Sequence, residues 1–190
     1  MARWEPNARE RLVRAAVDLF SEQGYDATTV TEIAERAGLT KTTFFRHFPD
    51  KREVLFAGQE AIGRLLADGA AGAPEGATPV EAVGAALDAA AAMFTPAQRE
   101  FGPLLREVIA ANSELRERAA LKSESFLEAM TEALRERGVP DTAAAVAAGL
   151  GALAFGRAFA RWTEPDCARS FPDLARAELR DLHAAAAALT

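Results

Sequence analysis

Apolar side chains recur every three or four residues along most of this 190-residue chain, which is the spacing of one face of an α-helix. The first such segment covers residues 7–23 and ends before Gly24, a residue type that often closes helices. We find no convincing strand pattern and no internal repeat. The pattern therefore predicts an all-α fold.

Start and stop signals divide the pattern into nine predicted helices. Thr29 and Glu32 form a capping box, in which the hydroxyl accepts from the third amide and the glutamate reaches back. Thr78 and Pro79 give a second start signal, with proline at the first helical position. Gly, Ala and Pro dominate residues 69–79, where we expect a flexible loop. The predicted helices are 7–23, 29–38, 41–48, 50–66, 78–94, one around 104–109, 113–137, 141–163 and 172–189.

The segment from Val30 to Pro49 has the spacing of a helix-turn-helix motif. Ala34 is small enough to let the second helix pack closely, and Gly38 supplies a turn in which positive φ is easy only for glycine. The second helix then presents short hydroxyl donors, cations and one ring, a face suited to base edges and phosphates in the major groove. Those residues are Lys41, Thr42, Thr43, Phe45, Arg46 and His47.

Four stretches around this motif follow one another in a specific order and spacing, namely Gly24–Val30, Ile33-Ala34, Ala37–Lys41 and Phe45–Lys51. Together they resemble the N-terminal domain of TetR-family transcriptional regulators, over roughly residues 8–56. The resemblance implies a nine-helix architecture with a three-helix DNA-binding domain at residues 1–52. It also implies a helical effector-binding and dimerisation domain at residues 53–190.

The resemblance also implies roles for individual residues in DNA binding. Thr29 and Thr31 are expected near the DNA backbone, and Thr40 and Lys41 open the recognition helix. Thr42 and Thr43 are expected deepest in the groove, and Phe45, Arg46 and His47 beside the phosphates. Lys51 is expected at the start of the fourth helix, where free amides help it to hold a phosphate. The family commonly has tyrosine at Phe45 and glycine or proline near Thr42, so the operator sequence does not follow from these residues.

A specific helix-turn-helix complex with DNA usually needs two copies, which contact half-sites about 34 Å apart. Apolar residues in the last helix repeat in a coiled-coil-like seam, and the preceding helix carries glycines that permit close approach, at positions 149, 151 and 156. The resemblance places the homodimer contact in these two helices. The alternative is that both stripes face only their own core. The predicted interface residues are Leu150, Leu153, Leu179, Leu182 and Ala186.

Large, soft and aromatic residues are concentrated in the middle helices. Such stripes can be ordinary core, but the resemblance implies an apolar effector pocket among the fourth to eighth helices, beside the predicted loop. We therefore expect a mostly apolar small-molecule effector. The candidate pocket residues are Met93, Phe94, Phe101, Phe126, Met130, Phe155, Phe159 and Trp162.

Composition narrows the remaining function classes. The formal net charge is −6, but residues 1–52 carry nine Lys or Arg against eight Asp or Glu, so a small DNA-binding face is compatible with an acidic chain. One cysteine and two histidines, far apart, argue against disulfides, a zinc site or any other cofactor. No catalytic motif is visible, so we do not expect an enzyme. No signal peptide is visible, and the uncharged residues 142–156 are too few for a membrane span, so we expect a cytoplasmic protein without a membrane partner.

The sequence thus predicts a dimeric transcriptional regulator that binds a palindromic operator in double-stranded DNA. A repressor that a small apolar effector releases from the operator fits the resemblance. The alternative is a helical ligand carrier or protein-interaction module whose helix-turn-helix does not bind DNA.

Overall fold

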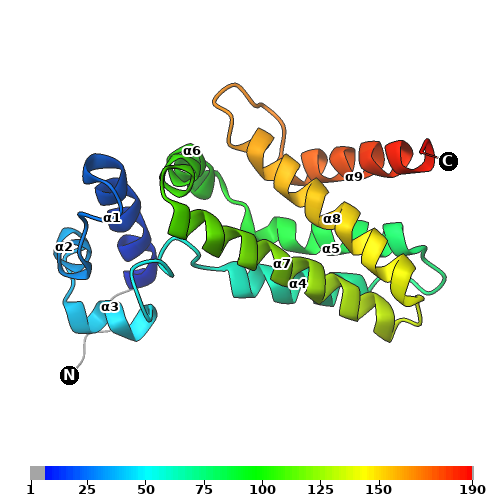
Figure 1. The fold of residues 1–190 in the computed structure, drawn as a ribbon, viewed down its shortest axis with the longest axis horizontal. Helices are drawn as coiled ribbons and strands as arrows, with labels where there is room; N and C mark the ends of the chain where they lie inside the picture. The colour runs from blue at the N-terminus through cyan, green and yellow to red at the C-terminus, as the bar shows by residue number, and fades with distance from the viewer. Residues whose placement is uncertain (1–6, 190) are drawn as a thin grey trace. The chain divides into compact units, whose positions relative to one another are not determined.

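A computed structural model describes residues 7–189, except the side chains of residues 96–98. These residues form nine α-helices and one 3-10 turn, with no strand, which confirms the all-α prediction (Figure 1). The elements are α1 (Ala8–Gln23), α2 (Val30–Arg36), α3 (Lys41–His47), α4 (Gln59–Ala71), α5 (Pro79–Ala90), η1 (Ala91–Met93), α6 (Pro96–Ala111), α7 (Ser113–Glu136), α8 (Asp141–Trp162) and α9 (Phe171–Ala187).

The chain divides into two compact units. The first extends to Ala57 and also includes Phe101–Ala119; the second contains Gly58–Glu100 and the residues from Ala120 onward. The division therefore falls after residue 57 rather than 52, and a later stretch of the chain joins the N-terminal helices. Helices α6 and α7 each begin in one unit and end in the other.

The first unit is built around the apolar face of α1. Leu12 and Ala16 on this face are fully buried, and Ile33 of α2 and Phe44 of α3 are buried in the same cluster. Val108 and Leu115, from the later stretch, are also in that core. The unit is therefore a three-helix group completed by the end of α6 and the start of α7.

The fourth helix begins nine residues later than the predicted start at Asp50, at Gln59. The Asp50 side chain accepts hydrogen bonds from the backbone amides of Arg52 (2.8 Å) and Glu53 (3.1 Å), but turns rather than a helix follow. Three successive apolar side chains are buried here, whereas a helix turned toward one core buries only one side. Gly58, at φ +92°, separates these turns from α4. The buried residues are Val54, Leu55 and Phe56.

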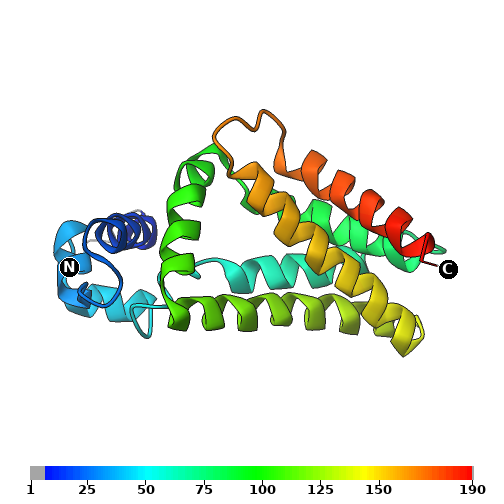
Figure 2. The same cartoon turned by 45° about the horizontal axis from the view of Figure 1, so that its top comes forward.

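Helices α4, α5, α8, α9 and the later part of α7 form the second unit, in which α4 runs alongside α7 and α8 crosses α5 (Figures 1 and 2). Gly69 lies within α4 rather than in the predicted loop. A Cβ built on it would lie 2.7 Å from the Cα of Ala86, so the missing side chain lets α4 and α5 approach closely. The loop between these helices is therefore shorter than expected, residues 72–78.

Candidate nucleic-acid interface

Local hydrogen bonds set the ends of both helices in the helix-turn-helix motif. The Thr29 hydroxyl accepts from the Glu32 amide (3.2 Å), and the Glu32 carboxylate accepts from the Thr29 amide (2.7 Å), which confirms the predicted capping box. Gly38 makes the turn at φ +66°. The Thr40 hydroxyl accepts from the Thr43 amide (3.1 Å) and caps α3.

Helix α3 is held to the unit by one face and exposes the other. Phe44 is fully buried and contacts Phe48, with ring centroids 5.6 Å apart. The opposite side of the helix carries the predicted recognition residues. Thr43 is half-buried, and the exposed members are Lys41, Thr42, Phe45, Arg46 and His47.

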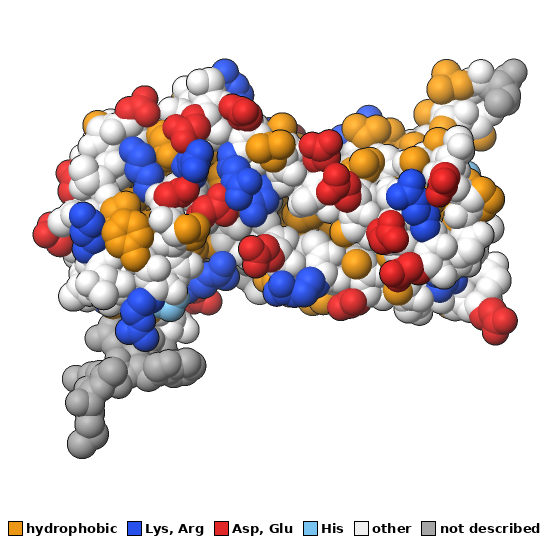
Figure 3. Space-filling view, turned by 60° about the horizontal axis from the view of Figure 1, so that its bottom comes forward, with side chains coloured by type: hydrophobic (Ala, Val, Ile, Leu, Met, Phe, Trp, Pro, Cys, Tyr) orange, Lys and Arg blue, Asp and Glu red, His pale blue; other side chains and the backbone are white. Residues whose placement is uncertain are grey.

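The cations of this face are not neutralised by neighbouring carboxylates. Within residues 7–189, Lys41 and Arg46 take part in no ion pair. Arg36 on α2, in contrast, is bound to Glu22, with its Nη2 2.7 Å from Oε2. Elsewhere on the first unit, Lys and Arg are mixed with Asp and Glu on the face drawn in Figure 3. The absence of acidic residues is therefore specific to α3 and not a property of the whole unit.

The threonines differ in how far their hydroxyls are already engaged. Thr29 and Thr40 use theirs in the two caps. Thr31 and Thr42 are exposed and form no side-chain hydrogen bond within residues 7–189. Of these four, Thr31 and Thr42 are the ones whose exposed hydroxyls are not used in a cap.

Lys51 lies away from any helix start, contrary to the expectation that it opens the fourth helix. Its amine donates to the carbonyl oxygens of Tyr25 (2.8 Å) and Thr28 (3.1 Å) and lies 4.2 Å from the Tyr25 ring centroid. These contacts fasten the loop between α1 and α2. The amine is therefore already engaged by the Tyr25 and Thr28 carbonyls and the Tyr25 ring. A phosphate contact by Lys51 remains a prediction.

Two arginines of α1 support the motif and were not predicted. Arg11 donates to the backbone carbonyl of Ala37, at the turn of the motif. The Arg9 guanidinium lies 5.4 Å from the ring centroid of Phe48, at the end of α3. Neither contact could be found from the sequence, because the periodicity of α1 places these residues only on its polar side.

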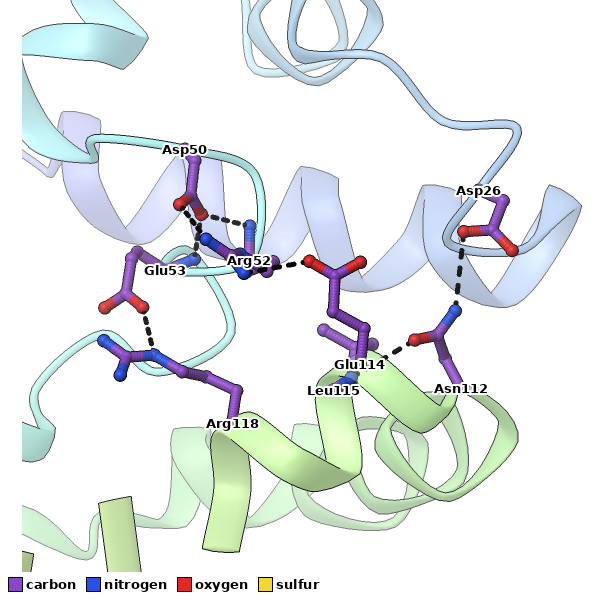
Figure 4. Close-up of polar contacts among 8 residues, drawn as sticks. All are labelled: Asp26, Asp50, Arg52, Glu53, Asn112, Glu114, Leu115 and Arg118. Atoms are coloured by element: carbon purple, nitrogen blue, oxygen red, sulfur yellow. Dashed lines mark hydrogen bonds and ion pairs between the residues drawn. The ribbon is translucent and has the colours of Figure 1, made fainter. Parts of the chain in front are cut away.

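Ion pairs join the turns after α3 to the start of α7 (Figure 4). Arg52 Nη1 lies 3.0 Å from Glu114 Oε1, and Arg118 Nε lies 2.5 Å from Glu53 Oε1. The two pairs have opposite polarity, since each segment supplies one cation and one anion. They connect the segment that follows α3 to α7, a helix that continues into the second unit.

The predicted dimer residues of α8 and α9 differ in how far they are exposed. Leu153 is 57% exposed, whereas Leu150, Leu182 and Ala186 are half-buried. Leu179 is only 5% exposed and belongs to the core of its own unit. Val146, one turn before Leu150, is 57% exposed.

Helix α8 is long and apolar enough to cross a membrane, by length and composition alone, but a core helix can pass the same test. Its most apolar window is 33% buried within this chain. Gly151 packs inside the unit, where an added Cβ would lie 2.4 Å from Val83 Cγ1, so its close approach is to α5. Gly156 has no atom within 4 Å of an added Cβ. The outer face of α8 is thus apolar and uncovered in the single chain.

Most of the predicted pocket residues form one aromatic cluster in the second unit. The rings of Phe94 and Phe171 are stacked, with centroids 3.8 Å apart, and Phe155 packs edge-on against both. Phe171 was not predicted, because it begins α9 and lies outside the expected helices. The other predicted members of the cluster are Phe126, Phe159 and Trp162.

The remaining predicted pocket residues lie elsewhere. Met130 is fully buried in the core of the second unit, and Met93 is half-buried near Gly58. Phe101 belongs to the first unit, where the Arg14 guanidinium lies 4.7 Å from its ring centroid. In the part of the chain that the structure describes, no cluster of His, Cys, Asp or Glu could hold a metal ion.

A helix-turn-helix with a lead-in helix, joined to a larger all-helical unit, is the architecture of a class of helical DNA-binding proteins. Comparison with known proteins shows which members of this class the chain is similar to. The sequence profile described as "Bacterial regulatory proteins, tetR family" matches residues 12–57. The HTH-type transcriptional regulator TcmR of Streptomyces glaucescens is 40% identical over 81 residues, which are 43% of this chain and 36% of that protein. The curated relatives are matched over less than half of their own lengths.

Solved structures match over nearly the whole chain. The fatty acid degradation regulator FadR from Bacillus halodurans has a TM-score of 0.59 at 19% identity, covering 95% of this chain and 96% of that one. The TetR-family regulator PfmR from Thermus thermophilus has a TM-score of 0.50 at 27% identity, covering 90% and 96%. The N-terminal part of the chain is therefore similar to the TetR family of bacterial regulatory proteins.

Proposed function

We propose that this chain is a transcriptional regulator that binds double-stranded DNA by placing α3 in the major groove. The observation that carries the proposal is the exposed face of α3, where Lys41 and Arg46 have no ion pair within residues 7–189. Phosphate contacts supply much of the affinity of such proteins, and unpaired cations can make them without first breaking a salt bridge. The family assignment of residues 12–57 supports the same role.

The second part of the proposal is a homodimer on a palindromic operator. Val146 and Leu153 are each 57% exposed and lie two turns apart on α8, with Leu150 between them. Two copies that cover these stripes would remove the apolar surface from water, and two recognition helices could then reach half-sites about 34 Å apart. Leu182 and Ala186 of α9 can extend the contact, whereas Leu179 is occupied by its own core.

The third part is repression relieved by a small, mostly apolar effector that binds in the second unit. The aromatic cluster around Phe94 and Phe171 is the candidate site. Helices α6 and α7 run from that unit into the first, where Glu114 and Arg118 are ion-paired to the turns after α3. A shift of these helices would move the recognition helix off its half-site. A 100-fold loss of DNA affinity needs about 2.7 kcal/mol of differential effector affinity.

Fluorescence anisotropy with a duplex from the region upstream of the chain's own gene tests the DNA-binding proposal. We expect specific binding that weakens steeply with salt. Arg46→Ala should weaken binding and reduce the slope of log affinity against log salt by about 0.9 for each phosphate that the variant no longer neutralises. Arg64→Ala, an exposed cation on α4, is the matched control and should change neither. No binding at low salt, to this duplex or to any enriched from a random pool, would favour the carrier alternative.

A further inference from the structure

The recognition face contains one large apolar side chain that nothing in the unit covers. Phe45 is 49% exposed, and it is the one exposed large hydrophobic residue among the described residues of the first unit. Its ring touches Phe44 edge-on, with centroids 5.6 Å apart, so it is anchored on one side and open on the other.

The polar groups beside Phe45 limit what this face can read. Successive residues lie about 100° apart around a helix, so Lys41 and Phe45 share one side while Thr42 and Arg46 share the next. Lys and Arg pair with guanine or with phosphate and a Thr hydroxyl can bond to several base edges, whereas the side chains specific for adenine are Asn and Gln and those specific for cytosine are Asp and Glu. Residues 40–48 contain none of those four types.

A phenyl ring has no hydrogen-bond donor, so it gains nothing from a phosphate oxygen. The apolar group that distinguishes one base from the others in the major groove is the C5-methyl of thymine, and phenylalanine is one of the side chains that contact it. We propose that Phe45 reads a thymine in each operator half-site by packing its exposed ring against the C5-methyl group. This inference rests on the proposed DNA-binding function and adds a base specificity to it.

The test removes one methyl group at a time from the DNA. The probe is a duplex operator enriched by the protein from a random pool, in which each thymine is replaced in turn by deoxyuridine. When the thymine that Phe45 contacts is replaced in one half-site, we expect the wild-type protein to lose about fourfold in affinity, the value of one buried methyl group. When the symmetry-related thymines of both half-sites are replaced, the loss should be about 15-fold, the value of two.

Variants of the protein then assign the methyl contact to a side chain. Phe45→Ala should bind the thymine and deoxyuridine duplexes equally, and its salt dependence should match that of the wild type, because no charge is removed. Phe45→Tyr keeps the ring and should keep the discrimination. Leu121→Ala, which truncates a 51%-exposed side chain in the second unit, is the control.

Three results would overturn the inference while leaving DNA binding established. One is an operator with no position sensitive to deoxyuridine. Another is discrimination that persists in Phe45→Ala, and the third is discrimination that disappears in Thr42→Ser, which removes only the methyl group of that side chain. Failure to enrich any duplex would instead refute the proposed function.

Discussion

Two glycines of α8, five residues apart, should respond oppositely to the same substitution. At Gly151 an added Cβ would lie 2.4 Å from Val83 Cγ1 and 3.2 Å from Met130 Sδ, both fully buried neighbours. At Gly156 it would meet no atom within 4 Å. Both positions are inside the helix, so alanine brings each about 1 kcal/mol of helix propensity.

The propensity gain cancels when the two variants are compared, and the difference measures the steric cost alone. Overpacking a filled core costs about 1–3 kcal/mol, and a 2.4 Å approach to a buried methyl belongs near the upper end. We therefore expect Gly151→Ala to lower the free energy of unfolding by about 2 kcal/mol and Gly156→Ala to raise it by about 1 kcal/mol.

Urea denaturation followed by circular dichroism measures both values. In a Val83→Ala background the obstructing methyl group is absent, so Gly151→Ala should become neutral or stabilising. Equal effects of the two glycine substitutions, or no coupling between positions 83 and 151, would show that this face of α8 does not pack on α5. The face of α8 that carries Val146 and Leu153 would then not be the uncovered one.

Three further outcomes follow from the contacts described. Lys51→Ala should lower the free energy of unfolding by about 1–2 kcal/mol, because its amine holds two backbone carbonyls, and unchanged stability would contradict that anchoring role. Burial raises the pKa of Tyr25, the single tyrosine of the chain, to about 12, so absorbance at 295 nm should titrate near that pH when folded and near pH 10 in urea. The unfolded chain ionises first, so stability should fall as pH rises from about 10 toward 12, and a native midpoint near 10 would refute the burial. Burial alone would raise the pKa of Glu178, but the guanidinium groups of Arg161 and Arg157 outweigh it and hold that pKa below its usual range. The ionised Glu178 contributes a stabilising free energy that is fully present above the pKa of the unfolded chain and is lost as the pH falls through the lowered pKa of the folded chain. In Glu178→Gln the free energy of unfolding, measured by urea denaturation, should therefore depend less on pH in the acid range.

The helix-turn-helix could be predicted because its signals are local. Thr29 and Glu32, three residues apart, cap a helix, and Gly38 makes a turn that requires a positive φ. Such interactions close within one turn of chain. They are therefore visible in a sequence before any long-range contact is known.

The division into units could not be predicted because it depends on long-range pairing. Arg118 meets Glu53 across 65 positions of sequence, and no period or spacing shows that contact. The position of Gly69 could not be predicted for a related reason. Glycine disfavours a helix by local propensity, whereas here the backbone of α5 needs the space that glycine leaves in the middle of a helix.

The seam in α9 shows the limit of periodicity. Leu179 repeats with its neighbours at coiled-coil spacing, yet it is buried in its own unit, 3.7 Å from the position of a Cβ on Gly84. Spacing indicates that a face is apolar but does not identify what covers it.

The central claim is that two copies of α3 enter successive major grooves on one side of the duplex. The most direct test measures affinity for an enriched operator before and after five base pairs are inserted between its half-sites. Half a helical turn moves the second half-site to the far side of the DNA, since half-sites one turn apart are 10–10.5 base pairs apart. We expect specific binding to fall to the level of a duplex without the operator. Undiminished affinity would contradict the claim.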